Sequence, residues 1–405
     1  MQWQDELDSI LAESVASAQE RERHAFDQLA GPRAQSVVLY GAGNLGKKVL
    51  RGLRSHGVDP IAFADANPAL AGKQVENLPV FSPEEAARRF GKEAVFAVCV
   101  WHPDREHGVQ DIINRLCSMG AERVTSFVPL FWKFAETFLP YYLWDLPSRL
   151  LVHSAQIREV WQALEKNSLA HFAAELRFRL QGDFGAMPKP RLTSQYFAAD
   201  LYNLSDDECL IDCGAYDGDT IRDFVDAAGA FRRVIAFEAD RDNFRRLREY
   251  VAGQPKTIRE RISIREAAVG RTSGTLRFAA TAGTDAAVSA TGDTVVASSS
   301  LDDALAGEVP TIIKMDIEGS ELDALEGAAR VIGRHQPLLA VCVYHTPDHV
   351  WKIPLWLRKA EPEAKIVIRS YAVDGWESVC FAVPPGRGTN GGNRCEYSHA
   401  INLRG

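Results

Sequence analysis

Two glycine-rich turns carry the residues whose spacing in this sequence is suited to ligand chemistry. In LIDCGAYDGDT, Asp212 ends an apolar run, and Gly214 and Gly218 allow a tight turn before a helix. Such a turn exposes backbone amides, and the N-terminus of a helix favours a negative charge. The segment therefore predicts a ligand with an anionic end, such as the carboxylate of an amino-acid-like group.

The strands that follow this turn end in residues suited to an adenosine. Glu238, in VIAFEAD, is placed to accept hydrogen bonds from both hydroxyls of a ribose. The next strand ends in AAVG, where we expect Ala268 to line an adenine pocket, and a further strand leads into KMDIEGSE, which contains Asp316. Because the carboxyl ends of parallel strands meet at one edge, these residues are predicted to face one cleft.

The segments DCGAYDGDT, FEAD, AAVG and KMDIEGSELDALEGA occur in an order that resembles the FkbM family of S-adenosylmethionine-dependent methyltransferases. The resemblance covers roughly residues 196–383. It implies a seven-stranded class I methyltransferase fold, S-adenosyl-L-methionine as the cofactor, and O-methylation of a saccharide, nucleotide-sugar or related natural product. By the resemblance, the residues around the cofactor are Asp212, Gly214, Tyr216, Asp217 and Glu238. We add Gly218, Ala268 and Asp316 from their places in the turn and at the strand ends.

Methyl transfer to oxygen requires mainly that the acceptor be aligned, with help from a base. His345, at the end of the fifth strand, is predicted as the base because histidine accepts a proton near neutral pH. Asp316 is the alternative, as a base or as a group that orients the hydroxyl. A structural alternative is that Asp316 and Glu318 cap the following helix and that His345 is an ordinary hydrogen-bonded residue.

No metal is predicted. An alternative is that carboxylates and a histidine gather a divalent cation, although their spacing does not demand it. That set is Asp316, Glu318, Glu321, His345 and Asp348.

The second turn, GAGNLG, follows a strand and precedes a helix, and Asp65 ends the next strand, as in dinucleotide-binding motifs. This segment resembles the small nucleotide-binding domains of sugar acyltransferases, which implies a nucleotide or nucleotide-sugar ligand. We hypothesise that it recruits the acceptor through Gly41, Gly43, Asn44, Gly46 and Asp65. The alternatives are a turn kept for packing or dimerisation, a nicotinamide-dependent oxidoreductase working through this turn, and a non-catalytic nucleotide-binding scaffold.

The elements that must position these residues divide the chain into five parts. We predict an N-terminal helix at 1–33, a Rossmann-like nucleotide-binding domain at 34–130, a helical connector and lid at 131–207, the methyltransferase domain at 208–385 and a tail at 386–405. The fold class is α/β, with a doubly wound C-terminal sheet. Tyr196 and Phe197 are predicted to close over the cofactor. A small-residue stretch at 279–300 is predicted to be a surface hairpin or loop.

The charge composition of the chain limits the classes of partner that we expect it to bind. The chain has 46 Lys and Arg against 54 Asp and Glu, a formal net charge of -8, which provides no general attraction to nucleic acid or anionic membranes. No apolar run is long enough to span a bilayer, and the N-terminus lacks the pattern of a signal peptide. We therefore predict a cytoplasmic protein. A small-molecule or glycan acceptor is what the FkbM resemblance implies, and the sequence does not predict an oligomeric state.

Overall fold

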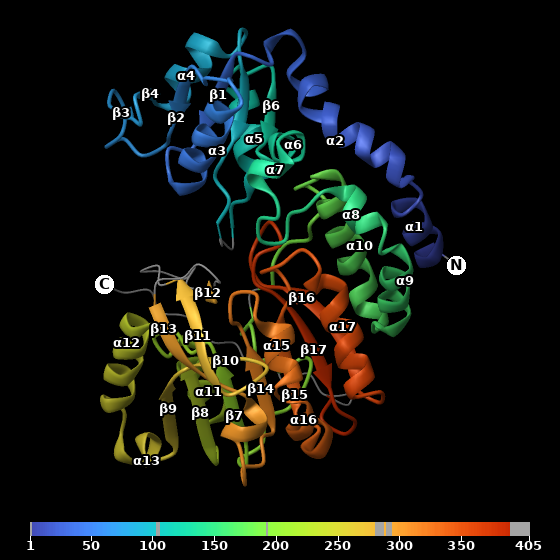
Figure 1. The fold of residues 1–405 in the computed structure, drawn as a ribbon, viewed down its shortest axis with the longest axis vertical. Helices are drawn as coiled ribbons and strands as arrows, with labels where there is room; N and C mark the ends of the chain where they lie inside the picture. The colour runs from blue at the N-terminus through green and yellow to red at the C-terminus, as the bar shows by residue number, and fades with distance from the viewer. Residues whose placement is uncertain (1, 103–105, 192, 280–286, 289–293, 389–405) are drawn as a thin grey trace.

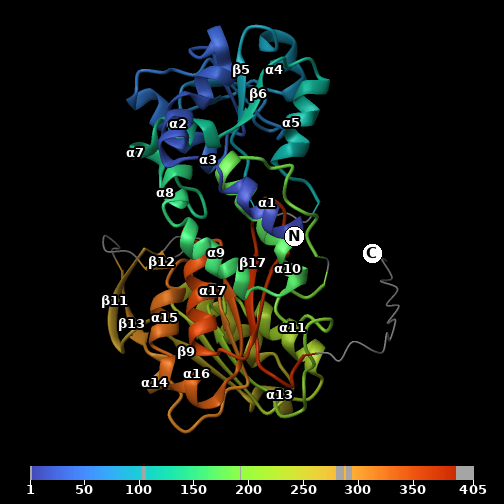
Figure 2. The ribbon, with the colours of Figure 1, turned by 90° about the vertical axis from the view of Figure 1, so that its right-hand side faces the viewer.

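The computed structural model describes residues 2–102, 106–191, 193–279, 287–288 and 294–388. Two α/β units are stacked along the long axis, with the N-terminal unit at the top of Figure 1 and the C-terminal unit at the bottom. Figures 1 and 2 place three helices at one side of the junction: α8 (Pro147–Leu151), α9 (Ser154–Ala163) and α10 (Lys166–Gln181). The α/β class predicted for both units is confirmed.

The N-terminal unit is built on a six-stranded sheet with the order β3-β4-β2-β1-β5-β6, parallel except for β3. All four residues of β1 are buried, as expected for a central parallel strand. The strands are β1 (Val37–Tyr40), β2 (Ala62–Ala64), β3 (Gln74–Val75), β4 (Leu78–Phe81), β5 (Val95–Val98) and β6 (Val124–Ser126). The helices connecting them are α3 (Asn44–Ser55), α4 (Pro83–Phe90) and α5 (Val109–Ser118).

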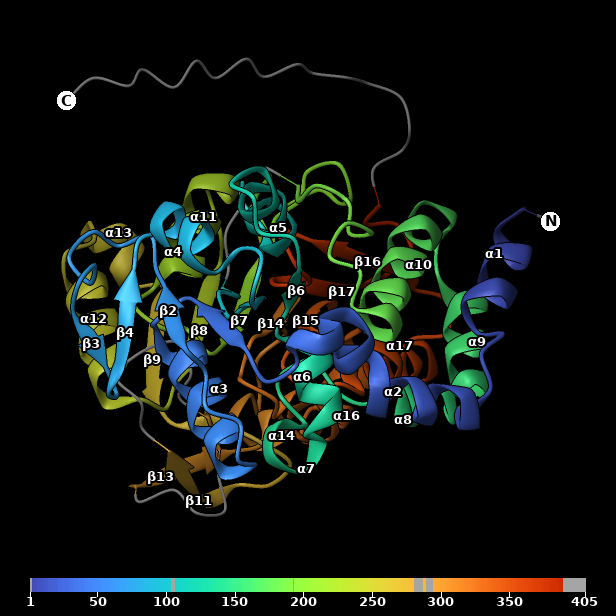
Figure 3. The same cartoon turned by 90° about the horizontal axis from the view of Figure 1, so that it is seen from above.

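The N-terminal segment forms two helices, which corrects the single helix predicted for residues 1–33. They are α1 (Gln2–Ile10) and α2 (Val15–Ala30), followed by a 3-10 turn, η1 (Gly31–Arg33). The helical conformation is interrupted between them, and α2 begins where the Ser14 hydroxyl caps it by accepting a hydrogen bond from the Ser17 amide at 3.1 Å. Seen from above in Figure 3, α2 lies beside α6 (Val128–Lys133) and α8, and the short α7 (Ala135–Phe138) follows α6.

The C-terminal unit contains the seven-stranded sheet predicted for it, in the order β16-β17-β15-β14-β7-β8-β9. The strands are β7 (Cys209–Cys213), β8 (Arg233–Glu238), β9 (Ile262–Glu266), β14 (Ile312–Met315), β15 (Leu338–Cys342), β16 (Lys365–Ser370) and β17 (Ser378–Val383). Only β17 runs antiparallel to its neighbours. Leu210 and Ile211 of β7 pack into different core clusters, so this strand is buried on both faces.

Among the described residues, seven helices follow or connect these strands. They are α11 (Asp219–Ala228), α12 (Arg241–Ala252), α13 (Lys256–Arg259), α14 (Leu301–Ala304), α15 (Glu321–Glu326), α16 (Ala329–His335) and α17 (His349–Ala360). Helix α17 packs against α9 of the connector, and α10 packs against β16 and α1. The connector is therefore docked on the edge of the large sheet.

A second, four-stranded sheet lies beside the first, with the order β10-β13-β11-β12. It comprises β10 (Ala268–Val269), β11 (Gly274–Ala279), β12 (Ala287–Val288) and β13 (Thr294–Ser299). The chain passes from the large sheet to the small one between β9 and β10. Strands β11 and β13 pair antiparallel in this small sheet, which was not predicted from the sequence. Most of the stretch 279–300, predicted as a surface hairpin or loop, lies outside the described residues, which omit 280–286 and 289–293.

Two further predictions concern the C-terminal tail and membrane-spanning segments. The described residues end at 388, so nearly all of the tail predicted at 386–405 lies outside them. Among the helices that the structure describes, none combines the length and the apolar character needed to cross a bilayer.

Candidate active site

One cavity of about 810 Å³ is lined by residues of both units, including both glycine-rich turns. The predicted site residues that line it are Gly41, Gly43, Asn44, Asp65, Tyr196, Gly214, Tyr216, Glu238, Ala268 and Asp316. The predicted residues that do not line it are Gly46, Phe197, Asp212, Asp217, Gly218 and His345. The structure thus brings most of two separately predicted sites to one cavity.

The turn after β7 approaches the backbone after β14 so closely that Gly214 has no room for a side chain. Gly214 has a φ of +81°, and a Cβ there would lie 1.8 Å from the carbonyl oxygen of Asp316. Glu238, at the end of β8, accepts hydrogen bonds from the amides of Tyr216 and Asp240, each at 2.8 Å. Burial raises the pKa of Glu238, and the two amides oppose this. Glu238 is therefore fixed at the cavity wall beside the turn.

Asp212 supports the turn from beneath instead of facing the cavity. Its carboxylate is fully buried and lies 3.0 Å from the Nζ of Lys314, which also donates to the carbonyl of Gly214 at 2.6 Å. Burial raises the pKa of Asp212 to about 6, although Lys314 opposes the shift. The sequence places an acid at the end of the strand but does not show which side of the strand it occupies.

Asp217 and Gly218 also have local partners. An Asp217 carboxylate oxygen lies 2.6 Å from the guanidinium of Arg222. Gly218 has a φ of +93°, and a Cβ there would lie 2.6 Å from the ring of Tyr250. Gly218 therefore permits the start of α11 to pack against α12, and the structure does not bring either residue to the cavity.

The turn after β1 has the same arrangement as the turn after β7, with an acid from the next strand bound to a backbone amide of the turn. Asp65, just after β2, accepts a hydrogen bond from the amide of Ala42 at 2.7 Å, as Glu238 does from Tyr216. A Cβ on Gly46 would lie 1.8 Å from the carbonyl oxygen of Gly41, so Gly46 lets α3 pack closely against the turn. A Cβ on Gly43 would meet nothing within 4 Å. Gly43 therefore leaves open space at the cavity wall, where a ligand has access to the backbone.

The two predicted lid residues have different surroundings. The hydroxyl of Tyr196 donates to Asp316 Oδ2 at 2.9 Å, and its ring lines the cavity. Phe197 packs against Phe224 of α11, with ring centroids 5.2 Å apart. Phe197 therefore has a packing role in the core. The lid role of Tyr196 stays a prediction.

His345 is buried behind Asp316 among three carboxylates. Its Nδ1 lies 2.7 Å from Glu321 Oε1, and its Nε2 lies 3.3 Å from Asp316 Oδ1 and 3.7 Å from Glu318 Oε1. Burial lowers the pKa of His345, but the carboxylates, above all Glu321, outweigh burial and raise the pKa to about 10. A histidine that keeps its proton at neutral pH cannot accept another, which argues against His345 as the base.

Comparison with known proteins shows which domain family the C-terminal unit resembles. Residues 212–367 match the sequence model of the FkbM methyltransferase domain. The chain contains an FkbM methyltransferase domain. A crystal structure of the methyltransferase FkbM from Methylobacillus flagellatus KT is 23% identical, with a TM-score of 0.75 over 94% of this chain and 98% of that chain. The two chains therefore share a fold that includes both units. The predicted class of enzyme, an S-adenosylmethionine-dependent methyltransferase, is confirmed.

The N-terminal unit has relatives of its own. Residues 33–130 match the CoA binding domain. The redox-sensing transcriptional repressor Rex of Clostridioides difficile is 30% identical over 24% of this chain and 47% of the repressor. The same repressor from Streptomyces avermitilis is 32% identical over 23% of this chain and 37% of the repressor. The chain thus spans less than half of these relatives. The prediction that it binds no nucleic acid stays a prediction.

The cavity is also lined by residues that were not selected from the sequence. Asp219 belongs to the predicted turn motif, so the motif itself contained a signal for it. Asn243 lies in the first turn of α12, the helix that follows Glu238 at the end of β8. Trp376 and Glu377 come from the loop between β16 and β17, for which the sequence shows no distinguishing pattern. Burial, with the charge of Asp316, raises the pKa of Glu377 to about 7.

Proposed function

We propose that this enzyme transfers a methyl group from S-adenosylmethionine to a hydroxyl of a saccharide, and that the saccharide is bound as a nucleotide-linked or related small acceptor. One observation carries the proposal: the turn of the FkbM domain and the turn of the N-terminal unit line the same cavity. Two nucleotide-binding turns that share one cavity are suited to bringing a cofactor and a nucleotide-bearing acceptor together.

The C-terminal half of the cavity has groups that fit the cofactor. The glycine turn at Gly214 leaves backbone accessible, Glu238 offers a carboxylate to ribose hydroxyls, and Ala268 offers an apolar surface to adenine. When bound, S-adenosylmethionine supplies a methyl group already activated by its sulfonium. The remaining task of the protein is to hold and orient the acceptor oxygen.

The other half of the cavity is suited to an acceptor with a sugar ring. Trp101 of the N-terminal unit and Trp376 of the FkbM domain lie with ring centroids 4.5 Å apart, and Tyr142 lies 5.1 Å from Trp376. All three line the cavity. Such rings present flat apolar surfaces together with polar atoms, a combination that matches a sugar with apolar C–H faces and polar edges.

Hydrogen bonds across the junction hold the N-terminal unit and the FkbM domain in place against each other. The indole nitrogen of Trp101 donates to the carbonyl of Asp374 at 3.1 Å, and the amide of Val109 donates to the Asp374 carboxylate at 2.8 Å. These bonds fix the loop between β16 and β17 against the N-terminal unit. Asp316, anchored by Tyr196, then faces the cavity as the carboxylate that orients the acceptor hydroxyl.

The N-terminal part of the proposal is tested by ligand binding to the purified chain and to a Gly43→Asp variant. The probes are uridine diphosphate glucose, guanosine diphosphate mannose, coenzyme A and NADH, with S-adenosylhomocysteine as the internal control. We expect a nucleotide-sugar to bind the unmodified chain and to lose at least about tenfold in affinity in the variant, because an added carboxylate repels phosphate. S-adenosylhomocysteine affinity should stay the same.

The outcomes separate the alternatives. Binding of NADH alone, with turnover visible as a change in absorbance, would favour a nicotinamide-dependent reaction. Failure of all four probes to bind would count against recruitment of a nucleotide-linked acceptor. A matched Gly43→Ala variant controls for the loss of glycine itself, since its methyl group has space.

A further inference from the structure

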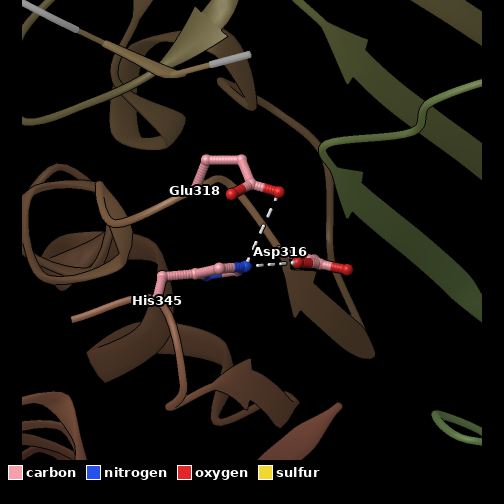
Figure 4. A group of neighbouring side chains, drawn as sticks. All are labelled: Asp316, Glu318 and His345. Atoms are coloured by element: carbon pink, nitrogen blue, oxygen red, sulfur yellow. Dashed lines mark ion pairs between the residues drawn. The ribbon is translucent and has the colours of Figure 1, made fainter. Parts of the chain in front are cut away.

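A group of three side chains at the cavity wall has the composition of a metal site. Asp316 follows β14, Glu318 lies in the same loop, and His345 follows β15. One carboxylate oxygen from each acid and one ring nitrogen of His345 all lie within 4.8 Å of one another. Figure 4 shows the two carboxylates and the imidazole Nε2 directed toward one another. Such a spacing leaves a common point that each donor atom can reach.

The ring nitrogen that faces this point lacks a hydrogen bond. The His345 side chain is 1% exposed, and among the described residues its Nε2 has no hydrogen-bond partner, although carboxylate oxygens of Asp316 and Glu318 lie 3.3 and 3.7 Å away. Buried polar atoms are nearly always satisfied, and those that are not call for an explanation such as a missing ion. A cation that takes the place of a proton on Nε2 would give this buried nitrogen a partner, with Asp316 and Glu318 as the neighbouring carboxylates.

The other ring nitrogen is held in the manner of a metal-bound histidine. Nδ1 lies 2.7 Å from Oε1 of Glu321, which is fully buried and also accepts a hydrogen bond from the amide of Ile317 at 3.0 Å. In metal sites a carboxylate commonly accepts the second N–H of the ligating imidazole, which fixes the tautomer and orients the other nitrogen. Glu321 thus directs the Nε2 of His345 toward Asp316 and Glu318.

The local charge and the access to the cavity fit a cation. Three carboxylates, Asp316, Glu318 and Glu321, surround His345, so the group keeps an excess of negative charge whether or not the imidazole is protonated. Asp316 and Glu318 line the cavity, with side chains 24% and 23% exposed. A cation held here would therefore have positions open to a ligand in the cavity.

We propose that Asp316, Glu318 and His345 bind one divalent cation, with Glu321 as the positioning residue for His345. Because the set combines two carboxylates with an imidazole, it fits a first-row transition cation such as Mn²⁺ or Co²⁺ better than Ca²⁺ or Mg²⁺, which prefer oxygen ligands throughout. The fourth and further positions face the cavity, where an acceptor oxygen replaces water.

The role of the cation rests on the proposed function. Coordination lowers the pKa of the acceptor hydroxyl, so its proton passes to solvent and the alkoxide stays bound to the cation. The oxygen then forms a bond to the methyl carbon as the carbon–sulfur bond breaks, and the electron pair of that bond neutralises the sulfonium. The products are a methyl ether and S-adenosylhomocysteine. This role removes the need for His345 to accept a proton.

The site is tested by Mn²⁺ binding to the full chain after treatment with a chelator, in the absence of cofactor and acceptor. Electron paramagnetic resonance of free Mn²⁺ gives the stoichiometry and affinity, and the visible spectrum of the Co²⁺ form reports nitrogen and oxygen ligands. We expect one Mn²⁺ per chain and a loss of affinity of at least about tenfold in Glu318→Gln and in His345→Gln. Glu321→Gln should lose about 10- to 100-fold.

A Glu326→Gln variant is the matched control, because Glu326 is an exposed acid on the same helix as Glu321 and pairs with Arg271. It should bind Mn²⁺ as the unmodified chain does. Thermal unfolding of each variant separates loss of the site from loss of the fold, and Glu318, a partly exposed residue, keeps the test informative if His345→Gln unfolds. The proposal is overturned if neither Mn²⁺ nor Co²⁺ binds stoichiometrically, or if a folded Glu318→Gln variant binds unchanged. Since no methylation is measured, failure to find an acceptor leaves this result unaffected.

Discussion

Gly43 and Glu238 line the same cavity, although one lies in the turn after β1 of the N-terminal sheet and the other ends β8 of the C-terminal sheet. In each unit an acid from the next strand accepts a backbone hydrogen bond from the glycine turn: Asp65 from Ala42 in one case and Glu238 from Tyr216 in the other. The shared cavity is what makes a two-ligand enzyme a better account of this chain than two independent binding domains.

The two glycines of the N-terminal turn should respond differently to substitution. Gly46→Ala should lower the free energy of unfolding by about 1–3 kcal/mol, because its Cβ would lie 1.8 Å from the carbonyl oxygen of Gly41. Gly43→Ala has space and should change the free energy by less than about 0.5 kcal/mol. Urea unfolding measures both. Equal effects would show that the close approach at Gly46 is not a constraint.

The buried pair of Asp212 and Lys314 should behave as structural support for the C-terminal turn. Asp212→Ala should destabilise the chain by about 3–5 kcal/mol, because it leaves the ammonium of Lys314 buried without its carboxylate partner. Pairing it with Lys314→Met should recover part of that loss, which a double-mutant cycle in urea measures. Strictly additive effects of the two substitutions would contradict the pairing.

Glu361, at the end of α17, should make stability depend on pH. It is 2% exposed, neither carboxylate oxygen has a hydrogen-bond partner among the described residues, and burial raises its pKa from 4.5 to about 8. The folded state therefore holds this proton more tightly than the unfolded state, so wild-type stability falls as pH rises from about 4.5 to 8.

A Glu361→Gln variant removes this titration. Relative to wild type, its free energy of unfolding should increase by a few kcal/mol, about 4 at most, between pH 4.5 and 8. Chemical unfolding of both proteins across that range gives the difference, in which the other titrating groups cancel. A difference that stays constant with pH would mean that Glu361 titrates normally.

The sequence predicted the main elements well because they depend on local pattern. The seven-stranded sheet expected in the C-terminal half is present, and the glycine turns follow β1 and β7 as expected. The small sheet was missed because β11 and β13 contain many small and polar residues, and their pairing depends on partners distant in the chain.

The site was predicted less completely, for reasons that particular residues show. Asp212 and Asp316 both come from strand ends, but only Asp316 lines the cavity, and no sequence pattern separates a side chain beneath a turn from one in front of it. Trp376 packs against Trp101 of the N-terminal unit, and Glu377 accepts a hydrogen bond from Gln195, contacts that form only in the folded chain. His345 was assigned as the base from its residue type. Its grouping with three carboxylates was considered only as an alternative, and the folded chain shows how close they lie to the ring and so how they change its chemistry.

The most direct test of the central claim is calorimetric titration with S-adenosylhomocysteine of the unmodified chain, a Glu238→Ala variant and a Glu266→Ala control. Glu266, an exposed acid at the end of the neighbouring strand β9, does not line the cavity. We predict one bound equivalent, a loss of about 10- to 100-fold in affinity for Glu238→Ala because charged hydrogen bonds are lost, and no change for Glu266→Ala. Absence of binding to the unmodified chain, or equal affinity in Glu238→Ala, would contradict the placement of the cofactor in this cavity.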